Sequence, residues 1–184
     1  MLQLSEKTLG DWLEYWAATT PDKEYIVYSD RNLRFTWKQF NHRVDNMAKG
    51  LLAIGVERGT HVGIWAGNVP DWLTFLYACA KIGAVAVTVN TNYKQAELEY
   101  LCQNSDMHTL CIVNGEKDSN FVAMTYNMLP ELKTFERGHM KSKRFPSMRN
   151  VIYIGQEKYR GMYNTSEILL LGNNIDENLV QSEL

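Results

Sequence analysis

The chain has 184 residues, of which 45% are hydrophobic and 22% charged, and its formal net charge is −2. This length and composition fit one folded domain with a core of its own, and they argue against disorder over the whole length. The near balance of 19 basic and 21 acidic side chains gives no reason to expect nucleic acid or an anionic membrane as partner.

The chain has three cysteines, Cys79, Cys102 and Cys111, and no C-x-x-C pair. An odd number at these spacings does not indicate a disulfide framework. Cys79 falls in an apolar helical segment and Cys111 in a strand-like one, so we expect both to be small core residues in a reducing compartment.

No basic segment followed by an apolar one marks the N-terminus as a signal peptide. The longest apolar stretch, residues 69–89, is interrupted by Asp71 and Lys81 and is too polar to span a membrane. We therefore expect a cytoplasmic protein without a transmembrane segment.

In chain order, a helix is predicted over residues 8–20, and a β-hairpin follows in which residues 25–28 and 33–35 flank the turn sequence SDRN. Thr36 stands where an N-cap belongs, and the helix after it ends at Gly55. Apolar residues follow that cap at alternating spacings of three and four, which is typical of an amphipathic helix: Trp37, Phe40, Val44, Met47, Leu51 and Ile54.

A strand is predicted over residues 61–65, with Asn68 as the cap of the next helix and Pro70 in its first turn. That helix is apolar nearly all round, reaches about residue 82 and ends at Gly83. The run AVAVTV, residues 84–89, is continuously apolar or β-branched, which predicts a strand covered on both faces.

Further along, the pattern predicts two helices and two strands: helices over residues 95–103 and 119–132, the latter interrupted by Pro130, and strands over residues 109–113 and 150–155. Four short apolar strands that alternate with helices indicate an α/β fold, a mostly parallel sheet of right-handed βαβ units flanked by helices, preceded by the N-terminal helix and hairpin. We expect one α/β unit over residues 1–172, with a basic loop over residues 133–149 and a frayed tail over residues 173–184.

Motifs that carry phosphate or nucleophile chemistry are absent from the sequence: G-x-x-x-x-G-K-[ST], G-x-G-x-x-G, G-x-S-x-G and H-E-x-x-H. The four histidines, His42, His61, His108 and His139, have no carboxylate or cysteine at metal-ligand spacing. We interpret them as surface or helix-face residues and expect His42 to be partly solvated.

Three other groups of residues could serve a site, and each has a simpler structural interpretation. Glu97 and Glu99 lie two apart on a helix and point in different directions, so a solvated face is favoured over an acid–base pair. Helical spacing explains most of the aromatic set as core rather than as the lining of an acyl pocket: Trp12, Trp16, Trp37, Trp65, Trp72 and Tyr77.

A basic stretch could steer an anionic ligand such as CoA or a phosphorylated partner: Lys133, Arg137, Lys141, Lys143 and Arg144. A solvated loop is favoured, because Glu131 and Glu136 dilute the charge and no aromatic stacking pattern is interleaved.

The segment from Leu33 to Asp106 resembles the opening of the adenylate-forming superfamily, above all its acyl-CoA synthetase branch. Leu33–Phe40 is similar to the first core motif, in which a strand runs into a helix through a Thr or Ser cap. Ala80–Asn90 is similar to the second core motif, a lysine–small–glycine turn into a buried strand. Residues 90–101, with Asn-Thr-x-Tyr and E-L-E-Y-L, look like fatty-acyl CoA ligases, and the whole match covers residues 8–113.

The resemblance implies a partial adenylate-forming N-terminal domain. In the complete enzyme a carboxylate attacks the α-phosphate of Mg-ATP to give acyl-adenylate and pyrophosphate, and the thiol of CoA then displaces AMP. The implied phosphate loop, metal ligands and C-terminal lysine have no counterpart in this sequence. The resemblance therefore supplies no catalytic residue, and we assign no cofactor-binding or metal-ligating residue.

The sequence thus favours an N-terminal fragment of an AMP-forming acyl-CoA synthetase, specific for a fatty or other apolar carboxylic acid and inactive alone. ATP, Mg and CoA are implied for the complete enzyme only, with the missing C-terminal portion as partner. The alternatives are a natural short protein that keeps the fold for binding or assembly, and a structural relic or engineered domain. An exposed edge of the sheet would favour self-association.

Overall fold

A computed structural model describes residues 6–116 and 119–175 of the chain. The helices of this part are α1 (Leu9–Thr19), α2 (Trp37–Ala53), α3 (Pro70–Lys81), α4 (Gln95–Asn104), α5 (Phe121–Met128) and α6 (Thr165–Asn173), with 3₁₀ turns η1 (Ser29–Arg31) and η2 (Pro130–Lys133). The strands are β1 (Glu24–Tyr28), β2 (Leu33–Thr36), β3 (His61–Trp65), β4 (Val85–Thr88), β5 (Thr109–Ile112), β6 (Gly115–Glu116), β7 (Ser119–Asn120), β8 (Asn150–Tyr153) and β9 (Tyr163–Asn164).

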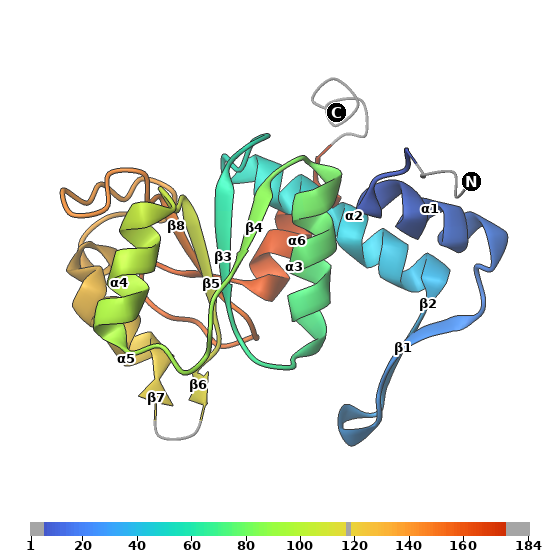
Figure 1. Ribbon diagram of the computed structural model, residues 1–184, viewed down its shortest axis with the longest axis horizontal. Coiled ribbons are helices and arrows are strands. Elements are labelled where there is room, and N and C mark those ends of the chain that lie inside the picture. The colour runs from blue at the N-terminus through green and yellow to red at the C-terminus, as the bar shows by residue number, and fades with distance from the viewer. Residues whose placement is uncertain (1–5, 117–118, 176–184) are drawn as a thin grey trace, which may run out of the picture.

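The core is a five-stranded sheet in the order β4-β3-β5-β8-β9, in which every neighbouring pair is parallel. All residues of β5 and β8 are buried. Figure 1 shows the layers: α4 and α5 lie on one side of the sheet, α2, α3 and α6 lie on the other, and α1 is outermost. The predicted α/β class and parallel sheet are confirmed.

The N-terminal elements follow the sequence pattern. Strands β1 and β2 form the predicted antiparallel hairpin, which reaches away from the body in Figure 1. The hydroxyl of Thr36 accepts a hydrogen bond from the Gln39 amide, and the Gln39 side chain accepts one from the Thr36 amide. This capping box satisfies two backbone donors and fixes the start of α2 where the hairpin ends.

Two details near the sheet correct the sequence prediction. Asn68 does not cap α3: the N-cap is Val69, which makes no side-chain cap, and Pro70 begins the helix. Pro70 explains this start, because its fixed φ suits the first turn and its missing N–H needs no partner there.

Strand β4 is not covered on both faces, since Val85 and Thr88 are exposed. It is the end strand of the sheet among the described residues, so one of its long sides has no strand partner. A β-branched run predicts a strand here, but it cannot tell an edge strand from a central one.

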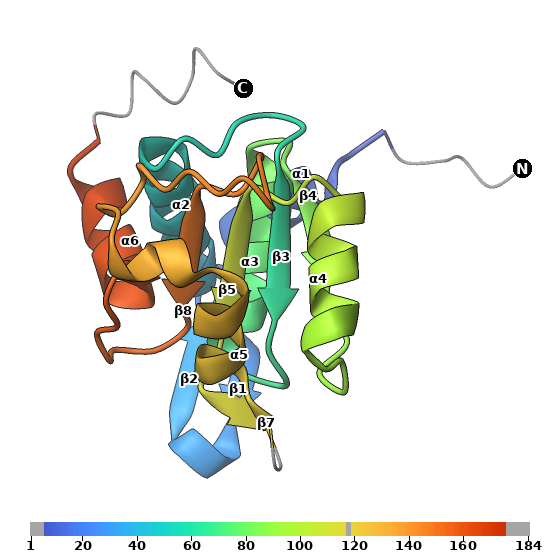
Figure 2. The same ribbon diagram turned by 90° about the vertical axis from the view of Figure 1, so that its left-hand side faces the viewer.

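Helix α6 and strand β9 were not predicted, yet they complete the layer beside α2. Figure 2 shows α2 and α6 side by side behind the sheet. A Cβ added to Gly50 would lie 2.1 Å from the Ile168 carbonyl oxygen, and one added to Gly172 would lie 1.9 Å from the Asn46 carbonyl oxygen. The two helix backbones therefore approach so closely that only glycine fits at both positions.

A buried ammonium group joins α1, α2 and α3. Lys81 is only 8% exposed at its side chain, and its Nζ lies 2.8 Å from Glu14 Oε1, 2.6 Å from Asp45 Oδ1 and 2.9 Å from Asn41 Oδ1. Together with the buried Leu13, this cluster holds α1 on the outer layer. Partners on two helices satisfy the charge, which would otherwise be costly to bury.

Residues 134–149 form no helix or strand, but this segment is more than a solvated loop, because Met140, Phe145 and Met148 are buried in the core. Of the predicted tail, Asn173 ends α6, and residues 176–184 lie outside the described part. No helix of the described part combines the length and apolar character needed to cross a membrane.

We expect Gly50→Ala to destabilise the protein by about 2 kcal/mol, since the added methyl meets backbone that no rotamer change can move away. The measurement is urea unfolding followed by circular dichroism. Lys38→Ala, at an exposed position of the same helix, is the control and should change the free energy of unfolding by less than about 0.5 kcal/mol. Equal stability of G50A and the wild type would show that the helices do not cross this closely.

Candidate functional site

In open α/β sheets, ligands bind outside the carboxyl ends of the parallel strands. At that end of β3, Trp65 is fully buried and stacks on Phe121 with ring centroids 3.7 Å apart. Its Nε1 donates a hydrogen bond to the Asn90 carbonyl oxygen at 3.2 Å. Trp65 therefore packs between the sheet and α5 and leaves no ring face for a ligand.

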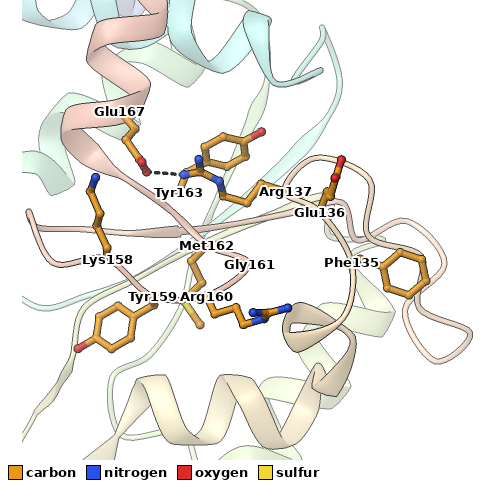
Figure 3. Close-up of a pocket in the computed structure, with 10 residues that line it drawn as sticks. All are labelled: Phe135, Glu136, Arg137, Lys158, Tyr159, Arg160, Gly161, Met162, Tyr163 and Glu167. Atoms are coloured by element: carbon orange, nitrogen blue, oxygen red, sulfur yellow. Dashed lines mark ion pairs between the residues drawn. The ribbon is translucent and has the colours of Figure 1, made fainter.

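A cavity of about 670 Å³ lies instead beside β9 and the start of α6. Figure 3 shows the ten residues that line it, which come from the segments before and after β8: Phe135, Glu136, Arg137, Lys158, Tyr159, Arg160, Gly161, Met162, Tyr163 and Glu167. Three of these side chains are cationic and three are aromatic. This pocket is the candidate functional site of the described chain.

An ion pair crosses the upper part of the pocket. Arg137 Nη1 lies 2.7 Å from Glu167 Oε2, and the Arg137 guanidinium lies over the Tyr163 ring at 4.9 Å. The same carboxylate accepts a hydrogen bond from the Asn164 amide, as part of the capping box that starts α6. Burial alone raises the pKa of Glu167, but the hydrogen bonds from Arg137 and Asn164, together with the positive charges of Arg137 and Lys158, hold the pKa below its ordinary value.

The floor of the pocket is held by backbone contacts. Gly161 has a φ of +78°, and a Cβ there would lie 2.0 Å from the Leu132 carbonyl oxygen. Arg160 Nε donates to the Lys133 carbonyl oxygen at 2.6 Å, and the Tyr126 hydroxyl donates to the Arg160 carbonyl oxygen at 2.9 Å. These contacts fasten residues 160–161 to η2 and α5, so the pocket is built on anchored backbone.

The aromatic residues singled out from the sequence do not converge on this pocket. Trp16 stacks on Trp37, Trp37 stacks on Tyr25 at 3.7 Å, and the hydroxyls of Tyr25 and Tyr77 are 3.0 Å apart. These rings join α1, the hairpin, α2 and α3. Trp65 is in the core, and Trp37, Trp72 and Tyr77 pack against it. The core prediction is wrong for Trp12 and Trp16, which are 38% and 39% exposed.

The basic stretch is divided by the fold. Arg137 enters the pocket, Arg144 pairs with Glu99 on α4, and Lys133 lies over the Tyr126 ring at 5.3 Å. Lys141 and Lys143 are exposed. One member of the stretch therefore reaches the candidate site.

Glu97 and Glu99 point to separate partners, as expected from their spacing. Glu97 accepts a hydrogen bond from the Lys94 amide, whereas Glu99 is paired with Arg144 and only 13% exposed at its side chain. The prediction of a solvated face is wrong for Glu99, because Arg144 lies against α4, pairs with Glu99 and accepts a hydrogen bond from Gln103 at its carbonyl oxygen.

No cysteine or histidine is among the residues that line the pocket. Burial raises the pKa of the Cys79 and Cys102 thiols to about 12 and that of Cys111 above its ordinary value, so none is a ready nucleophile. His42 is exposed, and burial lowers the pKa of His108, whose Nδ1 lies 2.9 Å from the Thr109 hydroxyl.

The pocket was missed from the sequence because loops on both sides of β8 form it. One local signal was available: Asn164 followed three residues later by Glu167 is the pattern of a capping box. It predicts the start of α6. It thereby places Glu167 in the first turn of the helix and Tyr163 just before the N-cap. Nothing local predicts that residues 135–137 meet them.

Comparison with known proteins identifies the family of this chain and solved structures with the same fold. The sequence profile of the family described as AMP-binding enzyme matches residues 13–142. YngI of Bacillus subtilis (strain 168), named as a candidate acyl-CoA synthetase, is 40% identical over 177 residues, which are 96% of this chain and 32% of YngI. The mitochondrial medium-chain acyl-CoA ligase ACSF2 of Bos taurus is 33% identical over 83% of this chain and 25% of its own length.

Among solved structures, a long-chain-fatty-acid-CoA ligase, FadD1 from Archaeoglobus fulgidus, superposes with a TM-score of 0.72 at 21% identity, over 93% of this chain and 31% of that one. The parallel sheet and its helices thus match part of the N-terminal domain of adenylate-forming enzymes. The chain belongs to the AMP-binding enzyme family. It spans about a third of the length of YngI and a quarter of that of ACSF2.

The lowered pKa of Glu167 predicts a pH effect on stability. A carboxylate with a depressed folded pKa contributes stability that is present above its unfolded pKa and is lost as the pH falls through the folded pKa. Glu167→Gln removes this contribution. Between about pH 6 and pH 3, we therefore expect the free energy of unfolding to fall more for the wild type than for E167Q.

Urea unfolding at several pH values measures this difference. Glu136→Gln is the matched control, because it removes an exposed carboxylate of the same pocket for which the described part shows no ion pair. Wild type and E167Q losing the same stability on acidification would contradict the assignment.

Proposed function

We propose that this chain is the N-terminal part of an AMP-forming acyl-CoA synthetase that activates a fatty or other apolar carboxylic acid. One observation carries the proposal: a relative named as a candidate acyl-CoA synthetase aligns with 96% of the chain at 40% identity, whereas the chain aligns with only 32% of that relative. ACSF2, named as a medium-chain acyl-CoA ligase, aligns in the same partial way.

In the complete enzyme, the carboxylate oxygen of the acid forms a bond to the α-phosphorus of ATP and pyrophosphate leaves. The CoA thiol then loses its proton and attacks the acyl carbon, and AMP leaves. ATP, Mg and CoA serve that whole protein, and its remaining portion is the natural partner of this chain. The described residues hold no group of three His, Cys, Asp or Glu side chains fit for a metal ion, and the sequence has no phosphate loop. No step of the reaction is therefore assigned to this chain.

In the proposed enzyme, this chain gives structural support to the segments that follow it. Buried strands β5 and β8 and the close pair α2–α6 form a rigid body from which later segments can extend. The proposal includes a role in fatty acid metabolism and a cytoplasmic location. The three free, buried cysteines support the latter, because they suit a reducing compartment.

The chain alone should be catalytically silent, since its sequence lacks the phosphate-loop motif that would neutralise the charge that develops on ATP in the transition state. The test incubates the purified chain with Mg-ATP, CoA and a panel of fatty acids and follows acyl-adenylate and thioester by mass spectrometry. The same chain extended by the matching remainder of YngI is the positive control. Turnover by the short chain would contradict the proposal.

One structural feature favours a second role, assembly. Within residues 6–116 and 119–175, no strand pairs with the outer side of β4, and Val85 of this strand is 42% exposed. An unpaired strand edge offers its N–H and C=O groups to another strand. We propose that isolated copies of this chain associate through this edge.

Light scattering over a range of concentrations tests this assembly. Val85→Lys should lower the associated fraction severalfold, because a charged side chain blocks edge pairing. Val27→Lys is the control, since Val27 is 44% exposed but belongs to the two-stranded hairpin and not to the five-stranded sheet. A wild-type chain that stays monomeric, or V27K and V85K acting alike, would contradict edge pairing.

A further inference from the structure

We propose that His108, Thr109 and Asn150 form a hydrogen-bond network that couples protonation of the His108 ring to the C-terminal end of α2. When the ring takes up a proton, the Asn150 side chain turns and releases the carbonyl oxygen of Ile54. This His108 network lies at the amino ends of β5 and β8, which are neighbours in the sheet. It does not depend on the proposed function.

The Asn150 side chain supplies a hydrogen-bond donor to the end of α2. Asn150 is 1% exposed, and its Nδ2 donates to the Ile54 carbonyl oxygen at 3.0 Å. Ile54 is the C-cap of α2, where the last carbonyl groups have no donor within the helix. Because only the amide nitrogen can face a carbonyl oxygen, Oδ1 points the other way, and it has no hydrogen-bond partner among the described residues.

The Thr109 hydroxyl connects this side chain to His108. Thr109 is fully buried, and its Oγ1 lies 3.4 Å from Asn150 Nδ2 and 2.9 Å from His108 Nδ1. The amide nitrogen can only donate, so the hydroxyl accepts from it and keeps one hydrogen to donate. In the described part, His108 Nδ1 is the partner that can accept this hydrogen. The neutral ring therefore carries its proton on Nε2.

A proton on His108 reverses the direction of these bonds. Both nitrogens of an imidazolium are donors, so Nδ1–H then donates to Thr109 Oγ1. The hydroxyl has to turn its own hydrogen towards Asn150, where it meets the amide nitrogen. A half-turn of the amide brings Oδ1 to the hydroxyl as an acceptor. The same half-turn places Oδ1 opposite the Ile54 carbonyl oxygen, so the bond to the helix end is lost.

Two charged side chains act on the His108 ring. Burial and, after it, the charge of Arg149 lower the pKa of His108, whereas Glu57 raises it. The His108 backbone is held on both sides, since its amide donates to the His61 carbonyl oxygen at 3.0 Å and its carbonyl oxygen accepts from the Arg149 amide at 2.8 Å. Glu57 lies in the connection between α2 and β3, so an imidazolium attracts this connection while the helix end loses its bond. Residues 54–60 are therefore the segment that responds to the proton.

The His108 network also predicts a loss of stability at mildly acidic pH. Because the pKa of His108 in the folded protein lies below its ordinary value, the unfolded chain takes up the proton more readily. The stability is complete above about pH 6.5 and is lost as the pH falls from there through the folded pKa. Between about pH 7.5 and pH 5, the urea midpoint should thus fall more for the wild type than for His108→Gln.

The main test follows the full chain by two-dimensional NMR between about pH 8 and pH 5. We expect the amide signal of Gly55, the residue after Ile54, to shift with the same midpoint as the His108 ring. Thr109→Val replaces the hydroxyl by a methyl group of similar size. In T109V the His108 ring should still titrate, but the Gly55 shift with that midpoint should be severalfold smaller.

His42→Gln is the matched control, because it removes an exposed histidine from α2 itself. H42Q should leave the titration of Gly55 unchanged, whereas H108Q should abolish it. Thermal unfolding of each variant shows that it is folded.

The proposal is overturned if the Gly55 amide does not titrate with His108 in the wild type, or if T109V keeps the full shift. It is also overturned if the wild type and H108Q lose the same stability on acidification. Should H108Q or T109V fail to fold, nitrogen NMR of the wild-type His108 ring decides. A neutral ring with its proton on Nε2 supports the network, and one with its proton on Nδ1 overturns it.

Discussion

The close approach of α2 and α6 is the contact on which the described structure depends. Gly50 and Gly172 let one helix backbone lie directly against the carbonyl oxygens of the other. Helix α2 also packs against α1 and α3, while α6 begins at the end of β9. One helix pair therefore connects the N-terminal elements to the last strand of the sheet, over more than a hundred residues of chain. Larger side chains at either glycine would separate the two parts of the core.

The sheet gives its two edges different characters. At one edge, β4 exposes Val85 and Thr88, and no strand of the described part pairs with its outer side. At the other, β9 has only two residues, and the pocket with its cations and tyrosines lies next to it. One edge thus bears an unpaired strand, and the other bears a pocket with charged and aromatic side chains.

Much of the fold could be predicted because its signals are local. The alternating spacing of apolar residues in α2, the cap at Thr36 and the apolar runs of β5 and β8 each lie within one short window. Family membership could also be recognised from the sequence, since several blocks agree in order. These are properties that a chain carries without reference to its distant parts.

The rest depends on distant parts of the chain. The position of β4 at an edge is a property of strand order, which its β-branched residues do not encode. Helix α6 is short, and its run ILLL shows no helical period, so only its capping box could have indicated it. In the pocket, Arg137, which precedes β8 in the chain, pairs with Glu167, which follows it. The sequence does not predict this contact. For this reason, a site formed by loops before and after a strand is difficult to predict from the sequence.

The ammonium group of Lys81 has a consequence for dynamics. Helix α1 buries Leu13 and carries much of its aromatic surface, including Trp12, outward. The buried Leu13, the pairing of Glu14 with Lys81 and the stacking of Trp16 on Trp37 hold it to the core. Local opening draws on the least buried elements, so α1 should exchange its amide hydrogens with solvent well before the amides of α2 do. The N-terminal helix would then behave as a separate cooperative unit on a core that stays closed.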